Sequence, residues 1–263
     1  MDLDLSNRRA VVCGSTAGLG RAAAVELALL GASITLVARN PDKLAATLAE
    51  LPRPRPAQQQ QHRCIAADLA DPASVRRAAG ELADDPAHIL INNTGGPPGG
   101  TAIDAAPDAY LAAFTAHLIA AQILAQALVP HMRVARFGRI VNVISTSVKA
   151  PIPNLGVSNT IRAAVAGWAK TLAAELGPDG ITVNNVLPGY TRTDRLSSLV
   201  TARAAKAGTS EQKIESDLIA TIPAGRFGEA HELGAAVAFL CSPAAGYING
   251  VNLPVDGGRL PTL

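Results

Sequence analysis

A glycine-rich turn near the amino terminus has the residue types and the spacing that bind a nucleotide phosphate. It runs from Cys13 to Gly20, CGSTAGLG, between a short apolar run and a stretch with helical periodicity. Gly14 can adopt the backbone angles of a tight turn, Gly18 lets the main chain approach a pyrophosphate, and Gly20 lets the helix pack close to the strand. The N–H groups and the positive dipole end of that helix would then face the anion. Glycine also marks ordinary turns, so it is the flanking strand and helix that favour cofactor binding.

The elements that must position this turn alternate along the whole chain. Short apolar runs alternate with longer helical patterns, which predicts an α/β fold with a parallel sheet covered by helices on both faces. The seven expected strands are residues 10–13, 33–38, 63–66, 89–91, 139–144, 182–186 and 252–255. The expected helices are residues 18–30, 42–51, 72–83, 107–133, 155–176 and 229–241.

Two segments break the alternation. Residues 52–61, PRPRPAQQQQ, contain too many prolines and polar residues for a helix or strand, which predicts a solvated loop, with a proline-rich docking motif as the alternative. Residues 190–225 are rich in Thr, Ser, Lys and Arg and are expected to form mobile helices over a site. Because no repeat or linker is evident, we expect residues 1–263 to form one domain with a substrate lid at 190–225, and residues 251–258 to form an edge strand and turn.

Charge and cysteine usage exclude several classes of protein. The 23 basic and 21 acidic residues leave a formal charge of +2. This net charge is too small to attract nucleic acid or an anionic membrane electrostatically. The cysteines are three, widely spaced and without a CxxC pair, which argues against a disulfide framework or a zinc site. Four of the histidines lie on different elements without the spacing of metal ligands, so no metal site is expected. They are His62, His88, His131 and His231. A reducing cytoplasm is the expected location.

Two segments have some of the features of membrane-directed sequences. Residues 1–9 carry two aspartates and lead directly into a strand, which argues against a signal peptide. Residues 109–129 are apolar enough to suggest a span, but they contain His117, Gln122 and Gln126, so a buried helix is expected instead.

The later landmarks of the chain resemble those of the short-chain dehydrogenase/reductase family. The resemblance rests on Asn92–Gly95 (NNTG) after the fourth strand, Ser145 after the fifth, and Pro188 with Gly189 after the sixth, in the family's order. It continues through NVLPGYTRT at 185–193 and VDGG at 255–258, and thus covers essentially the whole chain, with the proportions of the 3-oxoacyl-[acyl-carrier-protein] reductases. The resemblance implies a single Rossmann-type, doubly wound sheet, a nicotinamide cofactor, a small-molecule substrate and a homodimer or homotetramer.

The resemblance also assigns cofactor contacts. Asp68 matches the residue that hydrogen-bonds the adenine, and Asn93 with Gly95 matches the turn that supports the adenosine ribose. The alternatives are a helix cap for Asp68 and a plain turn at Pro188 and Gly189. The full set that the resemblance implies for cofactor binding is Gly14, Ser15, Thr16, Gly18, Leu19, Gly20, Arg39, Asn40, Asp68, Leu69, Asn93, Gly95, Pro188, Gly189, Thr191 and Thr193, of which the last four match the loop that holds the nicotinamide carboxamide.

The residue after the second strand distinguishes the two nicotinamide cofactors. A carboxylate there accepts hydrogen bonds from the ribose 2′-OH and repels a 2′-phosphate, whereas a guanidinium pairs with the phosphate. This chain has Arg39 followed by Asn40. We therefore expect NADP(H) rather than NAD(H), with a solvated surface arginine as the alternative.

The catalytic positions depart from the family. The family uses a Tyr as proton donor, a Lys four residues later and a Ser thirteen residues earlier; here Ser145 is in register, but the Tyr and Lys positions are Ser158 and Arg162. His117 stands where the family has an Asn. A serine hydroxyl is far less acidic than a phenol of pKa about 10, and an arginine does not pass a proton along a relay.

Three other side chains are candidates to supply the proton. Lys149 is our preferred donor, because it lies on the loop that lines the substrate side in the family and its pKa would fall on burial. His117 titrates near neutrality as a free residue and could enter a relay, and Tyr190 follows the nicotinamide loop. The structural alternatives are a solvated loop lysine, a core histidine and a packed tyrosine.

Two functions from different classes remain open. The first is an oxidoreductase that transfers a hydride between NADP(H) and a small carbonyl or alcohol, with Ser145 polarising the oxygen. The second is a catalytically inactive NADP(H)-binding protein, a sensor or an oligomer subunit. Residues 107–133 and 155–176 are apolar and Ala-rich enough for a subunit interface under both. The persistence of Ser145 and the nicotinamide loop favours the enzyme.

Overall fold

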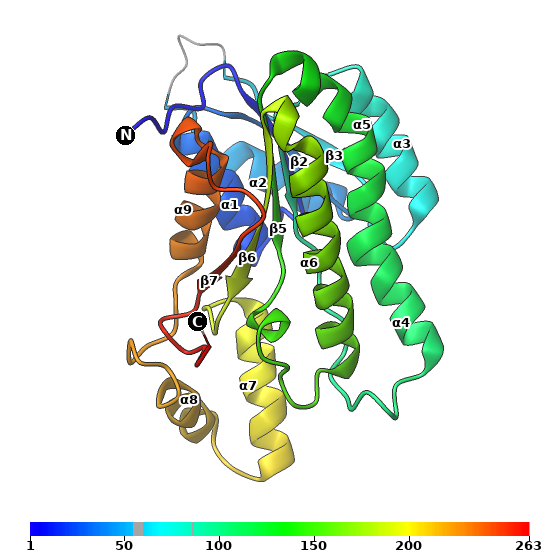
Figure 1. Ribbon diagram of the computed structural model, residues 1–263. Helices are drawn as coiled ribbons and strands as arrows, with labels where there is room; N and C mark the ends of the chain where they lie inside the picture. Colours follow the sequence, from blue (N-terminus) through cyan, green and yellow to red (C-terminus); the bar gives the residue numbers. More distant parts are fainter. Residues whose placement is uncertain (55–59, 86, 263) are drawn as a thin grey trace.

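A seven-stranded parallel sheet organises the computed structural model, which describes residues 1–54, 60–85 and 87–262 (Figure 1). The spatial order of the strands is β3-β2-β1-β4-β5-β6-β7. The strands are β1 Arg9–Cys13, β2 Ser33–Ala38, β3 Arg63–Ala66, β4 Ile89–Asn92, β5 Gly138–Val143, β6 Ile181–Pro188 and β7 Asn252–Val255. The order reverses between β1 and β4, so a crevice opens at their carboxyl ends, where open α/β sheets bind ligands. The predicted Rossmann-type sheet is confirmed, with β7 at its edge.

Helices cover both faces of the sheet (Figure 1). One layer contains α1 (Gly18–Leu29), α2 (Pro41–Glu50) and α9 (Ala230–Cys241), whose apolar side chains join one buried cluster with β1 and β2. The other layer contains α3 (Pro72–Ala83), α5 (Ala120–Ala135) and α6 (Gly156–Leu176), which pack in a second cluster on the opposite face. Two buried faces explain why the central strands are apolar on both sides rather than alternating.

The long apolar helix expected at residues 107–133 is interrupted. It consists of α4 (Pro107–Phe114), one π-helical turn (Thr115–Ile119) and α5, which ends at Ala135. The segment is long and apolar enough to cross a membrane by length and composition, and 44% of its most apolar window is buried. Its inner side chains, among them Leu124 and Leu128, pack against the sheet, as the prediction of a buried helix requires.

Two further helices occupy the segment predicted as a lid. They are α7 (Asp194–Ala207) and α8 (Glu211–Ile219), which lie beyond the carboxyl ends of the strands in Figure 1. They share a small apolar cluster that is separate from the two main ones and includes Val200, Leu218 and Phe227. Of the predicted loop at 52–61, residues 55–59 lie outside the described residues.

A ladder of four asparagines crosses β4, β5, β6 and β7. Asn92, Asn142, Asn185 and Asn252 are register partners on neighbouring strands. Each side-chain amide donates to the carbonyl oxygen of the next, at 2.8 Å in all three bonds. Asn142 at the centre is only 1% exposed, so its amide depends on these two bonds. The ladder holds the four strands in one register, and Asn92 and Asn142 stand near the carboxyl ends of β4 and β5, beside the crevice.

Candidate active site

The glycine turn is shaped by contacts that only glycine permits. Gly14 and Gly18 have positive φ angles of 57° and 52°. A Cβ on Gly20 would lie 2.2 Å from the Gly14 carbonyl oxygen, so the first turn of α1 packs directly on the turn that precedes it. Asn93, after β4, donates its amide to the carbonyl oxygen of Gly14 at 3.2 Å. The turn is therefore tied to both strands at the reversal point of the sheet.

The other members of the turn have different surroundings. Ser15 is fully buried, and its hydroxyl donates to the Val37 carbonyl at 3.3 Å, so this side chain holds β1 to β2. Thr16 stays partly exposed at the open side of the turn. Leu19 packs against the cluster beneath α1.

Beyond the ends of β2 and β3 lie the residues expected at the adenosine. Arg39 is exposed and forms no ion pair within the described residues. Asn40 caps α2, since its side chain accepts from the Lys43 N–H at 2.9 Å. Asp68 accepts from the Ala70 N–H at 2.9 Å in a local turn, whereas Asp71 is the residue that caps α3. The helix-cap alternative for Asp68 is therefore wrong, and Leu69 beside it lines a small cavity.

The loop after β6 closes the crevice from the other side. A Cβ on Gly189 would lie 2.6 Å from the Asp256 Cα, so only glycine fits between β6 and the turn after β7. Thr193 caps α7, and its methyl carbon lies 3.4 Å from the position of a Cβ on Gly18. Thr191 is 7% exposed and its hydroxyl donates to the Gly189 carbonyl. The loop from Pro188 and the glycine turn thus face each other, while Gly95 is exposed after β4.

The structure brings together three of the predicted catalytic positions. Ser145 follows β5 and accepts from the Ser147 N–H at 3.0 Å. Arg162, on α6, donates from Nε to the Ser158 hydroxyl at 3.2 Å and from Nη1 to the carbonyl oxygens of Val143 and Ile144 at 3.2 and 2.7 Å. Because Ile144 immediately precedes Ser145, this guanidinium lies next to the serine that is in register with the family.

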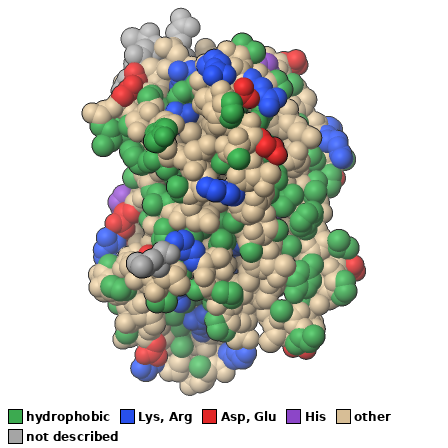
Figure 2. Space-filling view, viewed as in Figure 1, with side chains coloured by type: hydrophobic (Ala, Val, Ile, Leu, Met, Phe, Trp, Pro, Cys, Tyr) green, Lys and Arg blue, Asp and Glu red, His purple; other side chains and the backbone are tan. Residues whose placement is uncertain are grey.

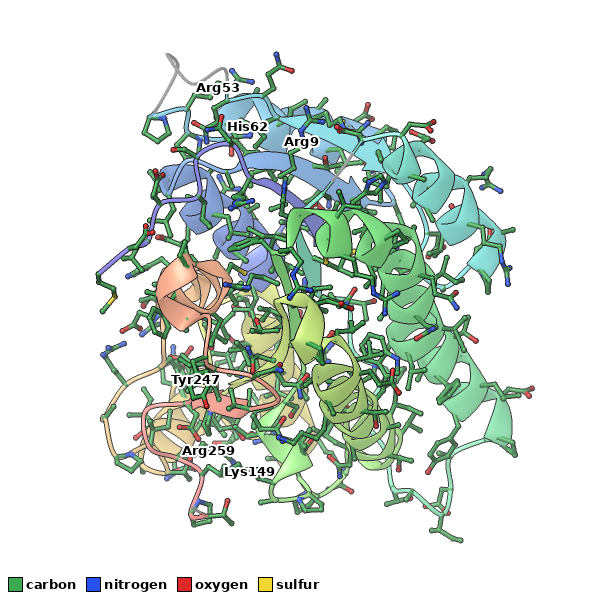
Figure 3. All side chains as sticks on the ribbon, turned by 45° about the horizontal axis from the view of Figure 1, so that its top comes forward. Arg9, Arg53, His62, Lys149, Tyr247 and Arg259 are labelled. Atoms are coloured by element: carbon green, nitrogen blue, oxygen red, sulfur yellow. The ribbon has the colours of Figure 1, made fainter. Side chains whose placement is uncertain are left out.

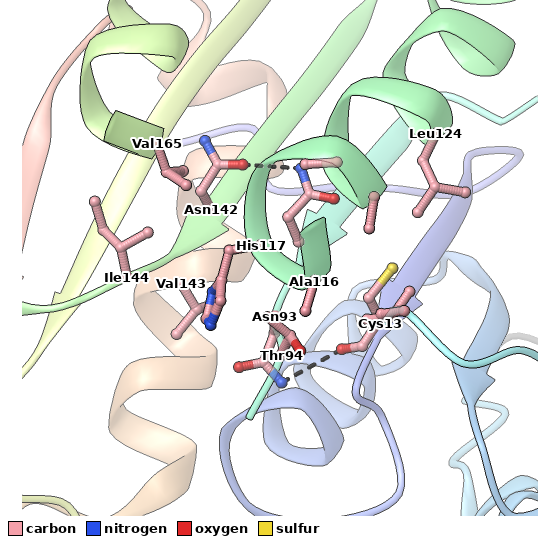
Figure 4. A pocket seen from close by; sticks show the side chains of 14 residues that line it. Cys13, Asn93, Thr94, Ala116, His117, Leu124, Asn142, Val143, Ile144 and Val165 are labelled. Carbon is pink, nitrogen blue, oxygen red and sulfur yellow. Dashed lines mark hydrogen bonds between the residues drawn. The ribbon is translucent and has the colours of Figure 1, made fainter. Parts of the chain in front are cut away.

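The remaining two candidates lie on different elements. Lys149 ends the short helical turn after Ser145 and is half-buried; Figure 3 shows it at the end of the molecule opposite His62 and Arg9. His117 lies on the π-helical turn and is 7% exposed. With Asn93 and Asn142 it lines a cavity with about 20 Å³ of free volume, enough for one water molecule (Figure 4).

Comparison with known proteins identifies the family. The family model described as Enoyl-(Acyl carrier protein) reductase matches residues 14–259. The 3-oxoacyl-[acyl-carrier-protein] reductase FabG of Haemophilus influenzae is 33% identical over 258 residues, which cover 97% of this chain and 98% of that protein. The chain belongs to the short-chain dehydrogenase/reductase family.

Two further members of this oxidoreductase family resemble the chain over its whole length. The NADPH-dependent reductase BacG of Bacillus subtilis is 30% identical over 98% of this chain and 100% of that protein. The crystal structure of L-sorbose reductase from Gluconobacter frateurii, complexed with NADPH and L-sorbose, has a TM-score of 0.92 at 32% identity and covers 100% of both chains. Family membership therefore rests on sequence and on fold together.

One expectation about the proton donors is wrong. Burial first, and the nearby Arg162 guanidinium second, lower the pKa of His117 to about 3, against a smaller opposing effect of its hydrogen bond with the Gly95 backbone. His117 is consequently neutral at physiological pH rather than titrating near neutrality, and it has no imidazolium proton to give there. Its sequence position as a helix residue carries no sign of this burial.

Tyr190 is held by packing. Its ring meets Phe227 edge-on, with the centroids 6.3 Å apart, and the Arg259 guanidinium carbon lies 4.5 Å from its centroid. The Arg259 Nη2 group also lies 3.5 Å from the Tyr190 hydroxyl. These contacts favour the structural alternative for this tyrosine.

Arg195 is a residue that the sequence analysis does not single out, because no motif of the family marks it. It reaches from the lid to the Gly96 carbonyl.

The depressed pKa of His117 predicts a pH dependence of stability. Its folded pKa of about 3 lies below its ordinary value of 6.5, so between these values the unfolded chain binds a proton that the folded chain does not. The contribution of His117 to the free energy of unfolding is therefore fully present above pH 6.5. It decreases as the pH falls, by about 2 kcal/mol at pH 5. We expect His117→Asn to flatten the decline by about that amount in urea unfolding at pH 7.5 and pH 5. Equal declines in both proteins would contradict this. A slope remains in the variant, because burial also lowers the pKa of His88 to about 4 and lowers the pKa of His62.

Proposed function

We propose that the chain is an NADP(H)-dependent oxidoreductase that transfers a hydride between the nicotinamide and a small carbonyl or alcohol, in the manner of the 3-oxoacyl reductases. The observation that carries the proposal is the crevice between the glycine turn and the loop from Pro188. Gly14 and Gly18 have positive φ angles, and a Cβ on Gly20 or Gly189 would clash with neighbouring backbone, so other residue types would displace the turn and the loop that border the crevice.

The residues present fit this cofactor. The glycine turn and the amino end of α1 offer backbone N–H groups to a pyrophosphate, and α1 has no side-chain cap that would occupy them. Arg39, exposed after β2, suits the 2′-phosphate, and Asp68 and Asn93 suit the adenosine. When bound, the cofactor supplies or accepts the hydride. Thr191 and Thr193 would orient its nicotinamide end.

Proton handling is assigned to the side chains of this chain. Ser145 would donate its hydroxyl hydrogen to the substrate oxygen, since its Oγ already accepts from the Ser147 N–H. Ser158, whose hydroxyl accepts from Arg162, would stabilise negative charge that develops on that oxygen. Lys149 is the proposed proton donor, because His117 is neutral and Tyr190 is held by packing.

Consumption of NADPH against a panel of small carbonyl compounds tests the proposal. We expect NADPH to bind and at least one carbonyl to be reduced. Absence of NADPH binding would contradict the cofactor assignment. Tight NADPH binding without turnover of any panel member would contradict the enzymatic assignment alone.

Arg39→Asp is expected to reverse the cofactor preference. The guanidinium forms no ion pair among the described residues, so its full charge is available to a phosphate. Replacing it by a carboxylate removes a charge-assisted bond and adds repulsion, which should weaken NADPH binding about 10-fold to 100-fold and leave NADH unchanged or tighter. Dissociation constants from fluorescence titration measure both. Arg76→Asp on α3 makes the same charge change at an exposed site and serves as the control; equal losses in both variants would contradict a specific role.

A second function is favoured by one specific observation. The usual Tyr and Lys positions hold Ser158 and Arg162, which bond to each other in a buried place, and this arrangement suits a protein that binds NADP(H) without turning over substrate. Such a protein would act as a sensor or as a subunit of an oligomer.

Assembly and location complete the proposal. We infer that residues 1–263 form one domain with a lid at 190–225, and that the protein is a cytoplasmic homodimer or homotetramer. Exposed apolar side chains on α4, including Leu111 at 65%, support an interface there. Cys13, Cys64 and Cys241 are free thiols, as a reducing compartment favours.

On the face in Figure 2, basic side chains are scattered rather than gathered into one surface, which supports small molecules over nucleic acid as ligands. Light scattering during size-exclusion chromatography tests the oligomeric state.

A further inference from the structure

A buried guanidinium without an acidic partner stands beside Ser145. Arg162 is 8% exposed, and the acceptors of its hydrogen bonds are two backbone carbonyls and the Ser158 hydroxyl, all neutral. Its Nη2 group donates to none of the described residues. A buried cation without a counter-ion costs free energy, which a bound anion would offset.

A second guanidinium reaches from the lid to the loop after β4. Arg195 lies in the first turn of α7, and its Nη1 group donates to the Gly96 carbonyl at 3.3 Å, across the crevice from its own helix. Its Nη2 group lies 2.7 Å from the position that a Cβ on Gly96 would take. Arg195 has no ion pair among the described residues, whereas its neighbour Arg192 pairs with Glu229 at 3.1 Å.

The charges around this pocket are of one sign. Burial first, and Arg195 second, lower the pKa of Arg162 to about 10. Arg195 also contributes to the low pKa of His117, after burial and Arg162. The hydrogen bonds of the two guanidinium groups to described residues therefore end on neutral acceptors, which are backbone carbonyls and the Ser158 hydroxyl.

Arg139 shows what a purely structural arginine looks like in this protein. It is 4% exposed and also donates to backbone carbonyls, those of Gly138, Gly180 and Ser242. Its guanidinium carbon lies 4.1 Å from the centroid of the Phe137 ring, which stabilises the charge. Arg162 has no such ring contact among the described residues. Its side chain, from α6, bonds to the carboxyl end of β5, whereas Arg139 lies near the start of that strand.

We propose that Arg162 and Arg195 together bind a carboxylate of the substrate, beside the carbonyl or alcohol that Ser145 contacts. The inference rests on the proposed function and names its substrate class. Guanidinium groups match carboxylates in charge and in planar geometry. Because Arg162 bonds to the carbonyl of Ile144, one residue before Ser145, the carboxylate and the reacting carbon must be close together. A 2-oxo or 3-oxo acid, or the corresponding hydroxy acid, meets this requirement.

Binding of small acids to the protein saturated with NADP⁺ tests the proposal. NADP⁺ cannot reduce an oxo acid, so calorimetric titration measures binding alone. Because NADP⁺ is already bound, its phosphates occupy their own sites before the acid is added. We expect 2-oxobutanoate or 3-oxobutanoate to bind at least about tenfold more tightly than the neutral ketone 2-butanone. Arg195→Met should weaken binding of the acid about tenfold. Arg192→Met, which removes a charge from the same segment, should leave it unchanged.

Each contrary outcome has a definite meaning. Failure of both acids to bind, equal affinity for 2-butanone, or equal losses in Arg195→Met and Arg192→Met would overturn the carboxylate site. A loss of NADP⁺ affinity in Arg195→Met with unchanged acid binding would also overturn it, by assigning that arginine to the cofactor phosphates. These results leave the proposed function standing, whereas failure of the wild-type protein to bind NADP⁺ would remove the proposed function itself.

Discussion

Gly20→Ala is expected to lower NADPH affinity at least about 100-fold and the free energy of unfolding by about 3 kcal/mol. The new Cβ would lie 2.2 Å from the carbonyl oxygen of Gly14 and 2.7 Å from the Asn93 amide. Backbone cannot move aside as a flexible side chain can, so the first turn of α1 must separate from the glycine turn. That displacement alters the N–H groups offered to the pyrophosphate and weakens the bond from Asn93 to Gly14.

Gly80→Ala provides the matched control for this prediction. Gly80 lies on an exposed part of α3, and a Cβ there would meet nothing within 4 Å. Since alanine is favoured over glycine inside a helix, stability should rise by up to about 1 kcal/mol and NADPH affinity should not change. Urea unfolding and fluorescence titration measure both quantities. If Gly20→Ala binds NADPH as tightly as Gly80→Ala, the close approach is not needed for the cofactor.

Restoring the family's pair in Ser158→Tyr/Arg162→Lys is expected to raise turnover of neutral carbonyl compounds about 100-fold to 10,000-fold. A positioned general acid contributes that factor, and a phenol beside an ammonium is a far better proton donor than Ser158 beside Arg162. Ser145 is already in register with both positions. Steady-state NADPH consumption gives the rate, and the unfolding midpoint shows whether the tyrosine is accommodated at a site that is 5% exposed in the present protein.

The role of Lys149 is tested in the same background. If Lys149 supplies the proton in the natural protein, Lys149→Ala should abolish the original activity but leave the activity of the double variant nearly intact. Arg162→Lys alone, which keeps the charge without the phenol, should not raise turnover. A folded double variant without a rate increase would show that the missing donor is not what limits catalysis, and would favour the NADP(H)-binding protein.

Sequence reasoning succeeded where the determinant is local. The helices expected at 18–30 and 155–176 agree with α1 and α6 to within one residue at each end, because Gly31, whose φ is +100°, and Gly177 with Pro178 stop these helices locally. The uniform apolar composition of residues 107–133 predicts a single helix. The π-helical turn at Thr115–Ile119 depends instead on packing between α4, α6 and the sheet, which no local pattern records.

The amino-acid sequence by itself determined the alternation of strands and helices, the glycine turn, Arg39 after the second strand and the loss of the family's Tyr and Lys, because each depends on residue type and short-range order. Tertiary structure alone decided the surroundings of these residues. It placed His117 in a buried cavity beside Arg162, which makes the histidine neutral, and it brought Arg195 from the lid to Gly96. It also aligned four asparagines from four strands. Burial and electrostatic interactions act between residues far apart in the chain, so they exist only once the sheet has formed.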